Sequence, residues 1–163
     1  MLEVKLRVAN IVRFVSMILV MAALLLMYAY GTDDHSIRTT KDAFLPQFSK
    51  ATIFYTGLGV FAVFNLLMNW GIRSYREAKG YDPKSLLFKS EHQKAGVLFW
   101  IILLLAALNF LLGLMITYIG FIKIEGPSAQ IDYIALPVMG ISILCVVLVG
   151  LLVSVFRPAK VDG

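Results

Sequence analysis

Three asparagines are the residues best placed for chemistry inside the apolar parts of this sequence. Asn65 and Asn69 lie one helical turn apart, so a helix presents both on one face, and Asn109 lies near the middle of another uncharged run. A carboxamide in an apolar medium carries a free-energy cost unless it forms hydrogen bonds. The three amides therefore predict hydrogen bonds between helices or, as the alternative, uncharged ligands on the path of a polar solute.

The groups that catalysis or metal binding requires are poorly placed in this chain. His35 and His92 lie outside the uncharged runs, so a pair of axial haem ligands within a membrane is absent. Asp33, Asp34 and His35 are adjacent, and adjacent residues rarely converge on one metal ion. Cys145 is the single cysteine and has no second thiol to pair with. We expect no catalytic residue, no metal site and no cofactor, and therefore no enzyme.

Four long uncharged runs determine the fold class. The run from Ala95 to Ile122 has twenty-eight residues, and about twenty suffice for a helix to cross a hydrocarbon core roughly 30 Å thick. Hydrophobic residues make up 60% of the 163 residues, more than a soluble domain of this size can bury. The sequence predicts an all-α membrane protein, a single four-transmembrane-helix bundle. The expected spans cover about residues 13–31, 51–71, 95–121 and 133–156.

Basic residues are distributed unevenly around these spans. Eleven of the fifteen lysines and arginines lie in the N-terminal tail, in residues 73–94 and after residue 156. The positive-inside rule therefore predicts that both termini and residues 73–94 are cytoplasmic, so the basic charge needs no nucleic-acid partner. A short interfacial helix is expected over about residues 83–89. The candidate contacts with anionic lipids of the inner leaflet are Arg73, Arg76, Lys84 and Lys89.

Small residues predict where the helices approach each other. In the third run, steps of three and four residues place several small residues on one stripe with Asn109, and we expect this stripe to be the seam of the bundle. Its members are Ala106, Asn109, Gly113, Ile116 and Gly120. Gly150 and Ser154 form a small-xxx-small pair in the last run. Asn109 is expected deeper in the membrane than Asn65, so the two amides need not bond each other.

The first half of the chain carries a pattern that resembles a known family. Tyr28-Ala29-Tyr30 ends the first run, Phe48-Ser49-Lys50 ends the outer loop, and Ile53-Phe54-Tyr55 and Asn65 follow. Over residues 14–70 these features resemble small bacterial membrane proteins related to SdpI-type toxin-immunity proteins. The resemblance implies a bacterial inner (cytoplasmic) membrane and an immunity role. The histidine-phenylalanine and glycine pattern of that family's outer loop is absent at His35-Ser36-Ile37.

These observations favour a protein that works by contact. We expect no Asp, Glu, Lys, Arg or His in the interior of a span, which excludes proton relays and voltage sensors of the usual kind. The first hypothesis is a non-catalytic accessory or structural subunit of a larger bacterial inner-membrane complex, with other integral membrane subunits as partners. The second is a small carrier or channel subunit that uses Asn65, Asn69 and Asn109 as ligands. The third is a toxin-immunity-like membrane protein.

Overall fold

Four long helices make up the part of the chain that the computed structural model describes, residues 2–31, 49–78, 91–125 and 133–156. They are α1 (Leu2–Tyr30), α2 (Lys50–Glu77), α3 (Glu91–Glu125) and α5 (Ala135–Phe156). Each is long and apolar enough to cross a membrane. The prediction of an all-α protein with four transmembrane helices is confirmed.

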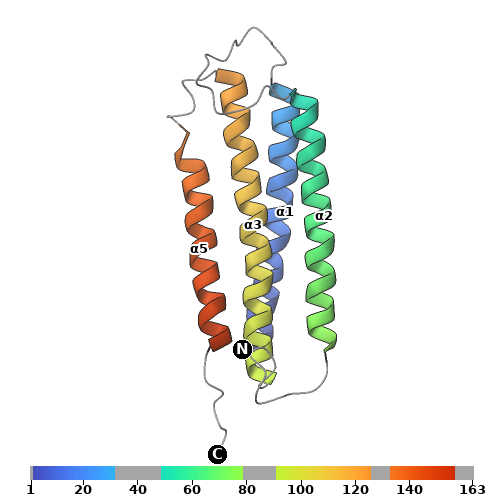
Figure 1. Ribbon diagram of the computed structural model, residues 1–163, viewed down its shortest axis with the longest axis vertical. Helices are drawn as coiled ribbons and strands as arrows, with labels where there is room; N and C mark the ends of the chain where they lie inside the picture. The colour runs from blue at the N-terminus through green and yellow to red at the C-terminus, as the bar shows by residue number, and fades with distance from the viewer. Residues whose placement is uncertain (1, 32–48, 79–90, 126–132, 157–163) are drawn as a thin grey trace, which may run out of the picture.

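The helices alternate in direction and lie roughly parallel along the long axis of the molecule (Figure 1). The start of α1, the end of α2, the start of α3 and the end of α5 lie at one end, which we call the basic end. The central helix is α3, which packs against each of the other three. α5 packs mainly on α3, whereas α2 packs on both α1 and α3. The protein is thus an antiparallel bundle with α2 and α5 on opposite sides.

Three helices extend further toward the basic end than the uncharged runs indicate, and α3 does so by beginning at Glu91 instead of about residue 95. α1 begins at Leu2 instead of about residue 13, and α2 continues to Glu77 instead of about residue 71. Helix formation requires only that the backbone bonds are satisfied, and charged residues outside the hydrocarbon core do not interrupt them. The interfacial helix expected at residues 83–89 lies outside the described residues.

The opposite end of the bundle, which we call the aromatic end, is held by a cap and by ring contacts. Ser49 is the N-cap of α2, where its hydroxyl accepts a 3.1 Å hydrogen bond from the Thr52 backbone N–H. Tyr28 of α1 and Phe54 of α2 have ring centroids 4.9 Å apart. Phe121 at the end of α3 stacks on Tyr133 before α5, with centroids 4.2 Å apart. Aromatic side chains are typical of a membrane interface.

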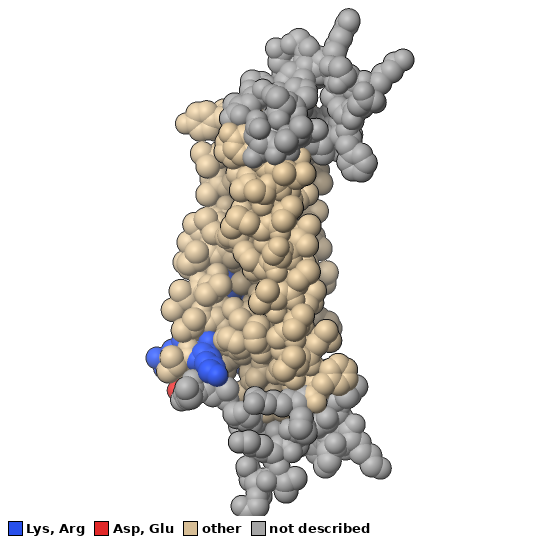
Figure 2. Space-filling model, turned by 90° about the vertical axis from the view of Figure 1, so that its left-hand side faces the viewer, with Lys and Arg blue, Asp and Glu red and all other residues tan. Residues whose placement is uncertain are grey.

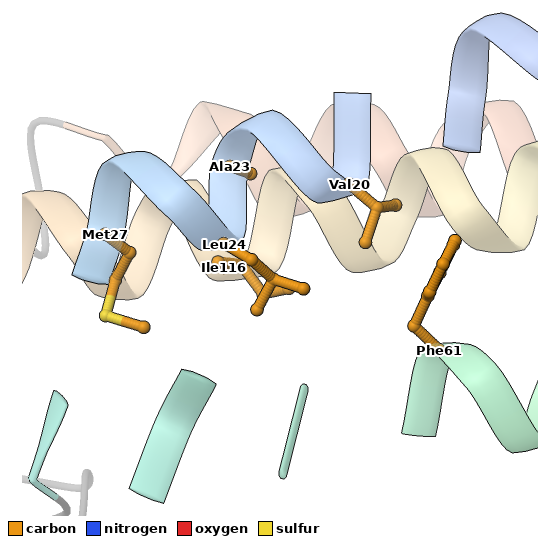
Figure 3. Close-up of a cluster of buried hydrophobic side chains, with 6 residues drawn as sticks. All are labelled: Val20, Ala23, Leu24, Met27, Phe61 and Ile116. Carbon is orange, nitrogen blue, oxygen red and sulfur yellow. The ribbon is translucent and has the colours of Figure 1, made fainter. Parts of the chain in front are cut away.

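Buried apolar side chains form two clusters along the bundle axis. The first is shared by α1, α2 and α3 toward the aromatic end and consists of Val20, Ala23, Leu24, Met27, Phe61 and Ile116. Figure 3 shows Phe61 reaching from α2 toward the other two helices. The second cluster lies toward the basic end and consists of Ala9, Ile72, Leu98, Ile102 and Leu105. Most other apolar side chains of α2 and α5 are exposed, as expected where lipid is the solvent.

Glycines allow α3 to approach its neighbours closely. A Cβ at Gly113 would lie 3.7 Å from the Val20 Cα of α1, and one at Gly120 would lie 3.4 Å from the Met27 Cγ. On the opposite side of α3, a Cβ at Gly140 of α5 would lie 3.2 Å from the Leu111 Cα. Further along α5, Gly150 lies against the indole ring of Trp100, which a Cβ would overlap. α3 therefore has two packing faces, one toward α1 and one toward α5.

Candidate polar site between the helices

The most deeply buried polar contact joins α2 to α3 through two asparagines. Asn65 Nδ2 donates to Asn109 Oδ1 at 2.9 Å, and Asn109 Nδ2 donates to Asn65 Oδ1 at 3.1 Å. Asn65 Nδ2 also donates to the Phe61 carbonyl at 2.9 Å. Asn65 is 5% exposed and Asn109 is 0% exposed. The expectation that these amides are too far apart in depth to need each other was wrong, because α2 and α3 place them directly opposite.

This amide pair separates the two apolar clusters. Along α2, Asn65 follows Phe61 of the first cluster and precedes Ile72 of the second. Along α3, Asn109 lies between Leu105 of the second cluster and Ile116 of the first. A reciprocal amide pair in such surroundings fixes the register of two helices, since a slip by one residue would leave two carboxamides unpaired in an apolar interior.

A second polar contact joins α1 to α2 nearer the basic end. Arg13 Nη2 donates to Asn69 Oδ1, so the two asparagines of α2 contact different helices. Ser16, which is 3% exposed, donates from its hydroxyl to the Arg13 carbonyl at 2.7 Å. Arg13 Nε is buried and has no hydrogen-bond partner among the described residues. Arg13 belongs to the candidate span Glu3–Tyr30 and lies where the sequence predicts the first span to begin.

Further basic residues lie between the Arg13–Asn69 contact and the basic end of the bundle. Lys94 of α3 donates from Nζ to the carbonyls of Arg76 at 3.0 Å and Ala78 at 2.6 Å, and so caps the end of α2. Arg73 and Glu77 form an exposed ion pair at 2.8 Å, one turn apart. Arg76 is also exposed, and its charge acts on Arg13. Figure 2 shows the blue side chains gathered toward this end, with tan over most of the bundle above them.

The predicted site residues fall into three groups in the structure. Asn65 and Asn109 meet in the amide pair, and Asn69 meets Arg13. The glycines lie at helix contacts, Gly113 and Gly120 against α1 and Gly150 against Trp100. Arg73 and Arg76 lie at the basic end, whereas Lys84 and Lys89 are outside the described residues. No group of three or more His, Cys, Asp and Glu able to hold a metal ion occurs in the described part of the chain.

Sequence reasoning missed the role of Arg13 and of Lys94. The sequence places both only among the basic residues that flank the uncharged runs. Residues 2–12 contain no proline or glycine to end a helix, which is the signal that α1 begins early and includes Arg13. The capping role of Lys94 depends on where α2 ends relative to α3, and the sequence around Lys94 does not indicate this.

A comparison of the chain with protein-family models, with curated proteins and with solved structures found no match. The resemblance over residues 14–70 to SdpI-related proteins therefore stays a prediction. The fold and the contacts define the class as a multi-pass membrane protein with four candidate spans whose buried polar side chains join neighbouring helices.

Proposed function

We propose that this protein is a non-catalytic accessory or structural subunit of a larger complex in a bacterial inner membrane, and that it acts through helix contacts. The observation that carries the proposal is the reciprocal pairing of Asn65 and Asn109. The deepest polar groups of the described bundle bond each other, and in this state they do not present ligands to a solute. Amides that bond each other in this way support a structural role more than a role in carrying a solute.

The arrangement of the helices agrees with this role. α3 packs against its three neighbours and has 44% of its most apolar window buried, whereas α2 and α5 each have only 11%. Their outward faces are therefore free to contact lipid or the helices of another subunit. The eleven-to-four distribution of basic residues supports an orientation with both termini in the cytoplasm.

Affinity purification in a mild detergent tests the proposal. A subunit is expected to elute with a larger membrane protein at a fixed stoichiometric ratio, which mass photometry or quantitative mass spectrometry measures. The same preparation is then reconstituted into liposomes and tested for the flux of small polar solutes. A homo-oligomer that elutes alone and transports a solute would replace the subunit with the carrier.

A matched pair of variants makes the measurement of solute flux specific for Asn109. Asn109→Leu removes one buried amide from the interior, whereas Ser142→Leu changes a polar residue on the exposed surface of α5. A carrier that uses Asn109 as a ligand would lose flux with the first change and keep it with the second. The proposed subunit shows no flux in any of the three proteins.

A further inference from the structure

Arg13 is a cation without a described counter-ion. The only carboxylate of α2 is that of Glu77, and it is paired with Arg73. The guanidinium of Arg13 uses Nη2 for Asn69, while its buried Nε is unpaired among the described residues. Arg76 adds a second positive charge close enough to act on the first. Arg76 lies seven residues after Asn69 on α2, about 10 Å along the helix axis, so an anion between these two levels can be reached by both guanidinium groups.

The depth of Arg13 indicates which anion is available. From Lys50, whose ammonium lies 5.9 Å from the centre of the Tyr28 ring at the aromatic end, α2 rises about 28 Å to Asn69. This length nearly equals the hydrocarbon thickness of about 30 Å. Asn69 and its partner Arg13 therefore lie at the inner boundary of the hydrocarbon core, where lipid phosphates begin.

An exposed tryptophan marks the same level. Trp70 follows Asn69 directly and is 73% exposed, so its indole faces the surroundings of the bundle instead of its core. Tryptophan is enriched where hydrocarbon meets the headgroups. Arg76 lies nearly two turns further along α2, beyond this boundary. Arg13 therefore approaches the headgroup layer from its hydrocarbon side, and Arg76 from its aqueous side.

We propose that the α1/α2 contact at Arg13 and Asn69, together with Arg76, binds the phosphate of an anionic phospholipid of the inner leaflet. Arg13 supplies a guanidinium that Asn69 holds toward α2, and Arg76 supplies the second charge from the headgroup side. The phosphate provides the negative charge that no described side chain places against Arg13. The lipid thereby links α1 to α2, two helices that the amide pair does not join.

Arginine charge near an anionic leaflet does not by itself make a site. Arg73 lies on the same helix near Arg76, but its guanidinium is already paired with Glu77 at 2.8 Å and is 79% exposed. The proposed site therefore depends on Arg13 and Arg76 and not on Arg73. Arg73→Gln is the matched control, because it removes one positive charge from the same end without touching the site.

Native mass spectrometry tests the site with two lipids of equal acyl chains. The full-length protein in a neutral detergent is mixed with equimolar phosphatidylglycerol and phosphatidylcholine, and the ratio of the two single-lipid complexes is measured. We expect a preference for phosphatidylglycerol of at least about fivefold, the contribution of one basic residue at a membrane surface. Arg13→Gln and Arg76→Gln should each lower the preference about fivefold relative to the wild type, and Arg73→Gln should retain it.

The same proteins separate the lipid from other sources of phosphate. Phosphatidylglycerol should raise the melting temperature of the wild type and of Arg73→Gln, but not that of Arg76→Gln, whereas inorganic phosphate should raise none of them. An equal rise with inorganic phosphate would show a site for free phosphate and overturn the lipid assignment. Should Arg13→Gln fail to fold, the exposed Arg76 still decides the matter, because an unchanged lipid preference in Arg76→Gln contradicts the proposal.

Discussion

The buried polar residues act in pairs, and each pair joins two helices that are distant in sequence. Asn65 bonds Asn109 between α2 and α3, and Arg13 bonds Asn69 between α1 and α2. The sequence predicted that the amides form interhelical contacts or ligate a solute, but not which residue meets which. Partner choice depends on the vertical offset of the helices, and a shift of one turn, about 5.4 Å, changes every partner.

At the residue scale, Lys94 makes a capping contact whose loss should be local. Its ammonium satisfies two carbonyls at the end of α2, and Lys94→Met keeps the length of the side chain but removes the donor. We expect faster amide exchange in the last turn of α2, measured by hydrogen–deuterium exchange, with a loss of about 1 kcal/mol in unfolding free energy. Unchanged exchange in that turn would show that the cap contributes nothing.

At the element scale, α3 organises the bundle because it uses opposite faces for α1 and α5. Part of this could be predicted from the sequence, since the steps of three and four residues in α3 identify the glycines that lie against α1. The face toward α5 could not, because Trp100 and Leu111 are large residues whose partners, Gly150 and Gly140, are small. Only the structure shows that these two large side chains of α3 each lie against a glycine of α5.

Gly113→Leu should separate α1 from α3. A Cβ at Gly113 fits at 3.7 Å from Val20, but the further carbons of leucine would enter the backbone of α1. We expect a loss of about 1–3 kcal/mol, the usual cost of overpacking, measured by unfolding in a detergent titration. Gly59→Leu is the control, because a Cβ there meets nothing within 4 Å. Because leucine is a better helix former than glycine, Gly59→Leu should cost nothing, and a similar loss in both variants would contradict the close contact at Gly113.

Gly150→Ala should weaken the contact between α3 and α5, and a smaller residue at position 100 should restore it. The added methyl overlaps the indole of Trp100, so the ring must move or α5 must shift. Trp100→Leu in the Gly150→Ala background makes room for the methyl. We expect the double variant to melt at a higher temperature than Gly150→Ala alone. A double variant that is less stable than both single variants would contradict this packing.

At the scale of the whole molecule, the fold class follows from hydropathy and length, whereas the orientation rests on charge. We expect a cysteine at Ser85 to react with an impermeant maleimide only from the cytoplasm and one at Thr39 only from the opposite side, in a Cys145→Ala background. The reason is the excess of basic residues at the ends of the spans nearest residues 73–94. The reverse labelling pattern would show that the orientation in the membrane is the opposite of the expected one.

The central claim is that the buried polar side chains of this bundle bond each other and hold its own helices together. It rests on the amide pair, whose members are unequal: Asn65 also bonds the Phe61 carbonyl, whereas Asn109 has Asn65 as its only side-chain partner within the described residues. Removing Asn65 therefore leaves a fully buried amide unpaired. Removing Asn109 leaves Asn65 with one bond, and removing both leaves no orphaned group.

A double-mutant cycle over Asn65→Leu, Asn109→Leu and the double variant measures this directly as unfolding free energy in a mild detergent. We predict that Asn65→Leu loses about 1–2 kcal/mol, that Asn109→Leu loses less, and that the double variant is close to wild type, which gives a favourable coupling of about 1 kcal/mol or more. Strictly additive losses, or no loss in either single variant, would contradict the account, because the two amides would then not hold α2 to α3.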